Sequence, residues 1–163
     1  MTSLHERRSV GVLPSDAHPI LRRIHEYWVS IRPEEGLLPG RQHMDPVDLR
    51  DVLNNIWLVD VVRAPLRFRW RLLGAIHAEA MRGNHVGRWV DEVIPDFASK
   101  PHYQSYLLAA EEGAFVYRAG PPMVRTDRDF MWVETIILPF AGDGRTVDMI
   151  MGAVVIIKGA QAQ

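Results

Sequence analysis

The sequence has no cysteine among its 163 residues. This absence excludes disulfide bonds, thiol nucleophiles, thiolate metal sites and any chromophore attached through a cysteine. It is compatible with the reducing cytoplasm, where we expect the protein to act. No apolar run is long enough to span a bilayer, and the residues up to Val12 lack the apolar segment of a signal peptide. We therefore expect neither export nor membrane insertion.

Neither sign of charge is in excess. The chain has 19 basic and 20 acidic residues, and its formal net charge is -1. No overall field attracts phosphate backbones or anionic lipid, so neither nucleic acid nor a membrane is expected as a partner. Arg67, Arg69 and Arg71 alternate along one segment, but no exposed aromatic residues are interleaved with them. This pattern favours a solvated or salt-bridged surface.

Motifs for metal binding and catalysis are also missing. The seven histidines form no His-x-x-x-His or similar cluster, so we expect no metal site, and the sequence does not identify a cofactor. No nucleophile elbow or phosphate loop is present. We therefore expect no enzymatic activity. Asp60 and His77 would form an acid/base pair if the fold brought them together, which keeps a small cone-shaped α+β enzyme, such as an isomerase or cyclase, as an alternative.

The composition is that of one globular domain, with 47% hydrophobic and 24% charged residues. Residues 1–14 are mostly polar and are predicted to be a flexible tail. The domain is predicted to occupy residues 15–158, and residues 159–163 are predicted to fray. Leu21, Ile24 and Trp28 recur at helical spacing, which predicts an amphipathic N-terminal helix capped by Ser15 or Asp16.

The later segments alternate between strand and short-helix patterns. Short helices are predicted at 45–53, 75–81, 89–94 and 103–112, and strands at 56–62, 67–73, 115–118, 130–140 and 146–157. Gly152, inside the last strand, indicates a bulge or the close approach of another backbone. The last two strands are apolar on both faces, so the sheet needs cover on both sides. We expect the short helices on one face, and the N-terminal helix on the other face or at a dimer interface.

Several segments, in their order and spacing, resemble the PAS domain in its alphaproteobacterial variety. They are 45–48 (DPVD), 56–61 (IWLVDV), 68–74 (FRWRLLG), 138–140 (LPF), 143–144 (DG) and 147–152 (VDMIMG). The resemblance covers Ile20 to Ile157. It implies an α+β fold with a five-stranded antiparallel sheet, short helices that enclose a small-molecule pocket, and a role in sensing or protein interaction.

The residues predicted to line such a pocket are aromatic, apolar or polar side chains near the sheet. They are Trp70, Leu72, His77, Met81, Tyr103, Tyr106, Trp132 and Glu134. The aromatic residues are equally compatible with an ordinary core. Glu134 interrupts an apolar strand, so it is predicted to pair with Arg118 or Arg125, or to accept a hydrogen bond from a ligand.

The sequence thus predicts a sensory or adaptor module without catalytic activity. It is expected to bind a small ligand, a regulatory protein, or both, and to form a homodimer through its N-terminal helix. No kinase, cyclase or DNA-binding segment fits beside the domain, so the output is expected to pass through a partner or through self-association. A purely structural dimerisation module with a filled core remains an alternative.

Overall fold

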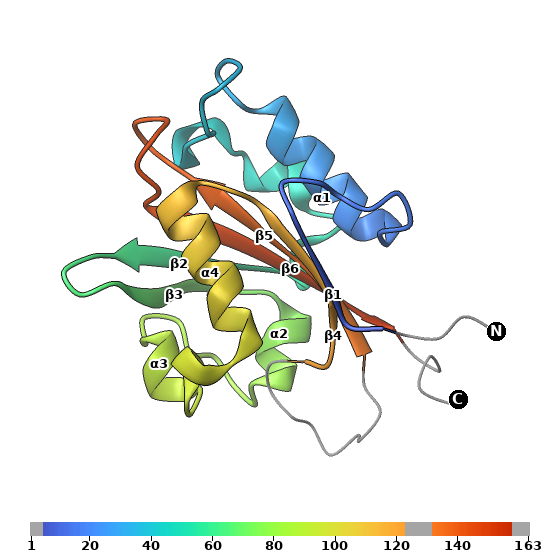
Figure 1. The fold of residues 1–163 in the computed structure, drawn as a ribbon, viewed down its shortest axis with the longest axis vertical. Helices are drawn as coiled ribbons and strands as arrows, with labels where there is room; N and C mark the ends of the chain where they lie inside the picture. The colour runs from blue at the N-terminus through green and yellow to red at the C-terminus, as the bar shows by residue number, and fades with distance from the viewer. Residues whose placement is uncertain (1–4, 123–131, 158–163) are drawn as a thin grey trace.

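The computed structural model describes residues 5–122 and 132–157, and its centre is one antiparallel sheet (Figure 1). The sheet has six strands in the order β1-β4-β5-β6-β2-β3. Their bounds are Arg7–Val10 (β1), Ile56–Val62 (β2), Arg67–Leu73 (β3), Val116–Gly120 (β4), Trp132–Phe140 (β5) and Met149–Ile157 (β6). The α+β class and all five expected strands are confirmed. Phe130 and Met131, predicted to begin the fourth of them, lie outside the described residues.

The sixth strand, β1, lies in the segment predicted to be a flexible tail, so that prediction is wrong for residues 7–10. β1 pairs with β4, with Arg7 opposite Ala119, and the Gly11 N–H donates to the Phe115 carbonyl at 2.8 Å. Its sequence, Arg-Arg-Ser-Val, has no apolar alternation that would indicate a strand. Backbone pairing and polar side chains hold it, including a 3.0 Å bond from Arg8 to the Pro101 carbonyl.

The N-terminal helix α1 (Pro19–Ser30) covers one face of the sheet, across β5 and β6. Its apolar stripe of Leu21, Ile24 and Trp28 is buried, and the Trp28 indole donates to the Pro139 carbonyl at 2.9 Å. The helix begins later than predicted, because the His18 side chain, not Ser15 or Asp16, caps it. Since the stripe packs on the sheet of its own chain, the reason for placing this helix at a dimer interface is removed.

Three helices cover the opposite face, as predicted: α2 (Ala75–Ala80), α3 (Val90–Val93) and α4 (Pro101–Glu112). Figure 1 shows α1 on one side of the sheet and these helices on the other. Four short 3-10 turns connect the elements: η1 (Arg41–His43), η2 (Pro46–Leu49), η3 (Leu53–Asn55) and η4 (Phe97–Ser99). The sheet therefore separates two apolar cores, one under α1 and one under α2 to α4.

A β-bulge between β2 and β3 changes which face the end of β3 presents. Val59 pairs with Trp70, whereas Leu58 pairs with Leu72, so Arg71 is an extra residue. The predicted alternation of apolar residues along β3 stops there. Leu72, expected to line a pocket beside Trp70, is 36% exposed. The next residue is also a leucine and packs against that core, so the apolar pattern alone did not show which of the two leucines faces it.

Gly152 was predicted to mark a bulge or the close approach of another backbone. It instead permits the close approach of a side chain, and the strand has no bulge there. It pairs with Trp57 and Ile137 in continuous registers. A Cβ atom at this position would lie 2.1 Å from the Trp57 ring, so the indole lies flat over the glycine. The glycine thereby positions a large aromatic ring against the sheet beneath α2 and α4.

Candidate functional site

A small, mainly apolar cavity of about 60 Å³ lies between the sheet and helices α2 and α4. Strands β2, β5 and β6 supply one wall, and the two helices supply the other. The lining residues are Trp57, Ile76, His77, Ala80, His102, Ser105, Tyr106, Pro122, Val133, Thr135, Ile137, Val154 and Ile156. The cavity occupies the face on which the sequence placed a pocket, but most of its residues differ from those predicted.

Two of the predicted residues, His77 and Tyr106, line the cavity. Trp70 and Met81 are buried in the same core without reaching it. Tyr103 packs against Phe97 at 5.2 Å between ring centroids and borders a separate pocket near α3. These three residues were placed on the correct face of the sheet, but their distance from the cavity depends on tertiary packing that the sequence pattern does not specify.

The other three predicted residues do not face the cavity. Leu72 is turned away by the bulge in β3. Trp132 and Glu134 alternate along β5 with Val133 and Thr135, which do line the cavity. Because successive side chains of a strand point to opposite faces, Trp132 and Glu134 lie on the α1 side of the sheet.

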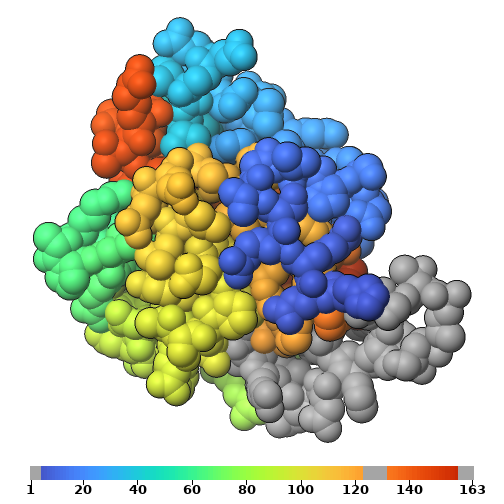
Figure 2. All heavy atoms as spheres, viewed as in Figure 1, coloured from blue at the N-terminus to red at the C-terminus, as the bar shows by residue number. Residues whose placement is uncertain are grey.

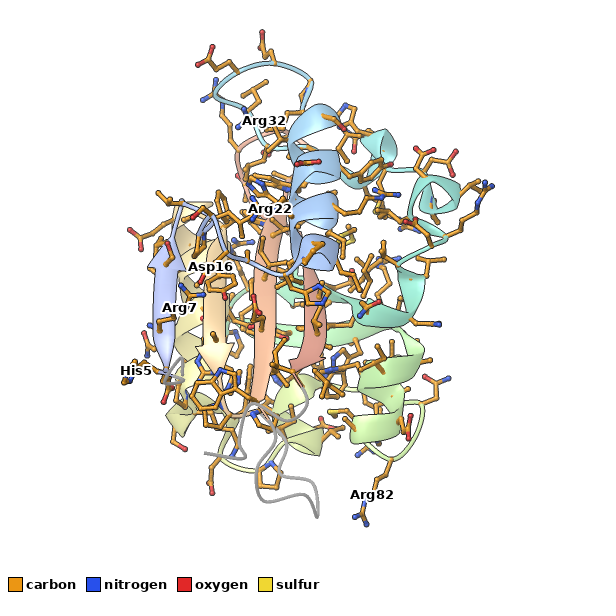
Figure 3. The ribbon with its side chains drawn as sticks, turned by 90° about the vertical axis from the view of Figure 1, so that its right-hand side faces the viewer. His5, Arg7, Asp16, Arg22, Arg32 and Arg82 are labelled. Atoms are coloured by element: carbon orange, nitrogen blue, oxygen red, sulfur yellow. The ribbon has the colours of Figure 1, made fainter. Side chains whose placement is uncertain are left out.

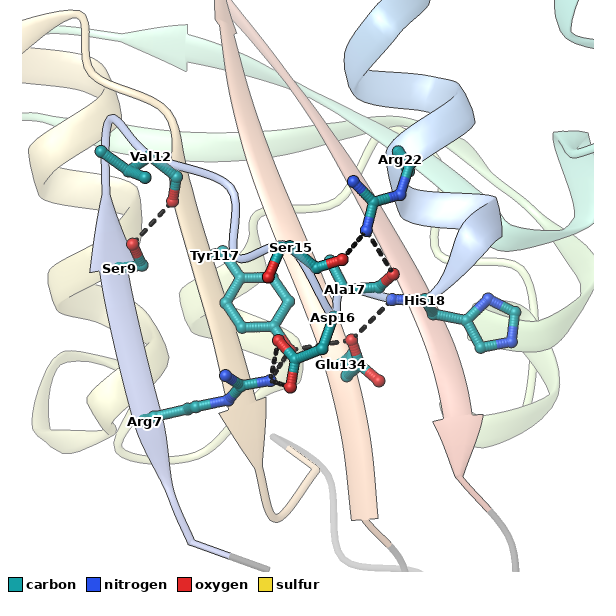
Figure 4. A network of polar contacts seen from close by, with 10 residues as sticks. All are labelled: Arg7, Ser9, Val12, Ser15, Asp16, Ala17, His18, Arg22, Tyr117 and Glu134. Atoms are coloured by element: carbon teal, nitrogen blue, oxygen red, sulfur yellow. Dashed lines mark hydrogen bonds and ion pairs between the residues drawn. The ribbon is translucent and has the colours of Figure 1, made fainter.

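The predicted pairing of Glu134 with Arg118 is wrong. Its carboxylate accepts a hydrogen bond from the Tyr117 hydroxyl at 2.8 Å and one from the His18 backbone N–H at 3.0 Å. Glu134 thereby holds the start of α1 against the sheet (Figure 4). Arg125, the other expected partner, lies outside the described residues.

The cavity residues missed by sequence reasoning include a polar stripe on α4. His102, Ser105 and Tyr106 stand at positions i, i+3 and i+4, so they share one face of the helix. This spacing is visible in the sequence, but hydrophobic periodicity does not identify a helix face with two polar residues as buried. Trp57 was also missed, and its signal is the glycine opposite it on β6.

Trp57 forms an aromatic end of the cavity together with His77 and Tyr106. The His77 ring stacks on the indole at 4.4 Å between centroids, with 12° between the planes. The indole N–H donates to the Tyr106 hydroxyl at 2.9 Å. Burial raises the pKa of Tyr106 above its usual value, so this hydroxyl keeps its proton. The proton has no acceptor within the described part of the chain.

The hydrogen bond from Arg118 fixes the tautomer of His102. The guanidinium is always a donor, so its 3.1 Å contact with His102 Nε2 makes that nitrogen an acceptor. The ring is then neutral, and its proton lies on Nδ1. Burial, followed by the charge of Arg118, lowers the pKa of His102 to about 3, in agreement with a neutral ring. Nδ1 is buried and has no partner among residues 5–122 and 132–157.

Two more buried polar atoms of cavity residues lack partners in the described chain. They are Nε2 of His77 and Oγ of Ser105, whose residues are 8% and 3% exposed. Burial lowers the pKa of His77 to about 4, so this ring is also neutral near pH 7. An unpaired buried polar group costs about 1–3 kcal/mol, and most such groups in folded proteins have a partner. Three such atoms therefore lie around this one cavity.

Arg118 links this cavity to the N-terminal segment. It is 3% exposed, on the cavity side of β4, and it donates to the Pro121 carbonyl at 3.1 Å as well as to His102. Those two bonds use Nη1 of Arg118, and its Nη2 forms an ion pair with Glu6, the residue immediately before β1. Figure 2 shows the N-terminal segment lying on the surface beside α4 and the strand that follows it. The buried cation is therefore neutralised by the segment at the edge of the sheet.

The next residue, Arg7, contacts the other side of the sheet. It donates to Asp16 at 3.0 Å and to the Tyr117 hydroxyl at 3.1 Å (Figure 4). In Figure 3, Arg7 points from the edge strand toward Asp16, near the start of α1. Tyr117 also donates to Glu134, which binds the cap of α1. Consecutive residues of the N-terminal segment thus contact the cavity wall and the start of α1.

The arginine strand face is salt-bridged, as the sequence indicated. Arg67 pairs with Asp91 at 2.7 Å and lies 4.1 Å above the Trp89 ring, while Arg71 pairs with Asp60 at 2.8 Å. Asp60 alternates with Val59 and Val61, which face the same core as Trp57, the residue on which His77 stacks.

Asp60 and His77 therefore lie on opposite sides of the sheet, and the proposed acid/base pair does not form. Among the residues that the structure describes, no group of three or more His, Cys, Asp or Glu side chains is arranged to hold a metal ion. No described helix has the length and apolar character needed to cross a bilayer.

One similar solved structure is described as that of an RNA-binding light-oxygen-voltage receptor. The two chains are 16% identical with a TM-score of 0.49, and the match covers 93% of this chain but 38% of that one. The expectation that nucleic acid is not a partner is contradicted by this neighbour and is withdrawn. A likeness at this level gives no argument for RNA binding in the present chain.

The family comparison covers most of the domain. No curated protein matches the chain. A family model described as the PAS domain matches residues 16–155, which include every described element except β1 and the last residues of β6. The six-stranded antiparallel sheet, with helices α2 to α4 over one face, agrees with that match. The chain belongs to the PAS domain family, a family of sensory modules.

Proposed function

We propose that this PAS domain senses a small molecule that binds in the cavity between α2, α4 and the sheet. The observation that carries the proposal is the set of three buried, unpartnered polar atoms on His77, His102 and Ser105 around that cavity. An apolar cavity with a few convergent polar groups is the usual form of a small-molecule site. A core that served only to stabilise the fold would gain by replacing such groups with apolar ones.

The N-terminal segment is the proposed output. Glu6 contacts the cavity through Arg118 and His102, and Arg7 contacts the start of α1 through Tyr117 and Asp16. A ligand that binds His102 alters one end of this chain of contacts. The docking of β1 and α1 then differs between the free and the occupied state, and a regulatory protein that contacts these elements can distinguish the two.

Filling the cavity tests the proposal. Ala80→Leu adds three carbon atoms to a residue that lines the cavity, whereas Ala75→Leu adds the same atoms to an exposed position of the same helix. We expect native mass spectrometry of the freshly purified protein to detect a bound small molecule. It should be lost in Ala80→Leu and kept in Ala75→Leu.

A thermal-shift screen of small fragments provides the second measurement. Compounds that stabilise the unmodified protein and Ala75→Leu should not stabilise Ala80→Leu. If no mass co-purifies and no fragment distinguishes the two variants, the cavity is not a ligand site and the proposal fails.

A further inference from the structure

We infer that the ligand is a compact, neutral molecule of about six non-hydrogen atoms or fewer that carries a hydrogen-bond-accepting oxygen, as a small ketone does. The inference rests on the proposed function, because it assigns a chemical class to the ligand of the same cavity. Three properties of the cavity carry it: its volume, its lack of uncompensated charge and the fixed direction of one hydrogen-bond donor.

The volume limits the size of the ligand. The cavity measures about 60 Å³. One water molecule needs about 10–15 Å³ on this measure, so the space holds about four to six atoms of that size. Large planar cofactors exceed this limit several times over. A ring of five atoms with one substituent lies at the upper end of the range.

The charges around the cavity favour a neutral ligand. No Asp, Glu, Lys or Arg side chain is among the lining residues that the structure describes. The rings of His77 and His102 are neutral near pH 7. The cation behind His102, Arg118, already forms an ion pair with Glu6. A charged ligand would lose its hydration here and find no opposite charge in contact with it, which is unfavourable.

The hydrogen-bond pattern requires an acceptor. His102 accepts from Arg118 at Nε2, so its buried Nδ1 carries a hydrogen and can only donate. Tyr106 accepts from Trp57, which leaves its hydroxyl proton as a second donor. A carbonyl oxygen has two lone pairs and can accept from two such donors. The apolar body of the same molecule would contact Val133, Ile137 and Val154.

Four probes of equal size test the inference. They have six non-hydrogen atoms each: cyclopentanone, methylenecyclopentane with the same shape but no acceptor, isobutyrate as an anion and cyclopentylammonium as a cation. Binding to the intact chain is followed by NMR titration of the Trp57 indole N–H and the α4 backbone amides. We expect cyclopentanone to bind at least tenfold more tightly than methylenecyclopentane, and the two ions to cause no saturable shift.

Two variants examine the donor itself. His102→Leu removes the Nδ1–H group and should reduce the affinity for cyclopentanone to that for methylenecyclopentane. His25→Leu, on α1 at the other face of the sheet, should leave both affinities unchanged. The comparison of the four probes on the unmodified protein needs no variant, so it remains decisive if His102→Leu fails to fold.

The outcomes separate this inference from the proposed function. If the hydrocarbon binds as tightly as the ketone, or if an ion binds best, the cavity is a ligand site but its assigned chemical class is wrong. If none of the four probes binds and no fragment distinguishes Ala80→Leu from Ala75→Leu, both proposals fail together.

Discussion

At the scale of single residues, the cavity is distinguished by buried polar atoms that have no partner in the described part of the chain. Ser105 lies on the buried face of α4, where its hydroxyl finds no partner in the described chain. Such a hydroxyl destabilises the folded state, because it has lost its contact with bulk solvent and gained no hydrogen bond in return. Residues of this kind are retained where a ligand needs them, at the expense of stability.

The first prediction follows for Ser105→Ala. The change removes the unpaired hydroxyl and introduces the best helix former, so the free energy of unfolding of the unliganded protein should rise by about 1 kcal/mol. Urea denaturation measures this difference. Gln104→Ala, at the adjacent exposed position of α4, is the matched control for helix propensity alone. A decrease in stability in Ser105→Ala would mean that the hydroxyl has a stabilising partner.

The second prediction concerns acid stability. His77 and His102 have folded-state pKa values of about 4 and about 3, below the usual histidine value of 6.5. The unfolded chain therefore binds more protons between these values, and the stability of the fold decreases as the pH falls. The loss should begin near pH 6.5, with a slope of up to about 1.4 kcal/mol per pH unit for each histidine.

The acid slope is measured by urea denaturation at a series of pH values from 7 to 4. His77→Gln removes one titrating ring and should reduce the slope. The remaining part should come from His102 and from His25, whose pKa is also lowered by burial. A stability that stays constant between pH 6.5 and pH 4.5 would contradict the burial of both rings in the neutral form.

At the scale of the elements, the sequence predicted what hydrophobic periodicity can encode. Leu21, Ile24 and Trp28 define the buried face of α1, and the two-sided apolar strands β5 and β6 required cover on both faces. β1 was missed because backbone pairing and arginine contacts hold it, and neither produces a periodic pattern. The bulge at Arg71 was missed because one inserted residue leaves the composition of β3 unchanged.

The third prediction compares the two ion pairs that hold β1. Glu6 neutralises Arg118, whose side chain is 4% exposed. Asp16 pairs with Arg7, whose side chain is 42% exposed. Glu6→Gln leaves a buried guanidinium without an anion and should lower the free energy of unfolding by about 2 kcal/mol. Asp16→Asn breaks an exposed pair and should cost about 0.5 kcal/mol or less. Equal effects in thermal denaturation would mean that Arg118 does not depend on Glu6.

At the scale of the whole molecule, the sequence identified the family and the face of the sheet that holds the cavity, but not the cavity itself. His77 and Tyr106, two of the residues predicted to line a pocket, do border the cavity, and they lie on elements whose buried faces can be read from the sequence. His102 and Ser105 were not, because a polar residue on a buried helix face is recognised only once the helix is docked. The partners of Glu134 could not be predicted either, since the bond to His18 joins residues that are 116 positions apart.

The described contacts connect the two faces of the molecule through its N-terminal segment. On the cavity side, Arg118 binds both His102 and Glu6. On the α1 side, Tyr117 binds both Arg7 and Glu134. A ligand that accepts the His102 Nδ1 hydrogen makes Nε2 a better acceptor, because hydrogen bonds in a chain polarise one another. The bond from Arg118 to His102 should then be stronger. This should hold Glu6, β1 and the start of α1 more firmly.

The fourth prediction measures this connection by amide hydrogen exchange. Saturation with cyclopentanone should slow exchange in α4, in β1 and in the first turn of α1, although α1 lies on the opposite face of the sheet from the cavity. Glu6→Gln should abolish the change in β1 and α1 and preserve the change in α4, because it breaks the connection outside the cavity. Asp16→Asn weakens only the exposed pair and should retain most of the effect. If α1 is unaffected by the ligand, or responds equally in Glu6→Gln, the N-terminal segment does not carry the signal.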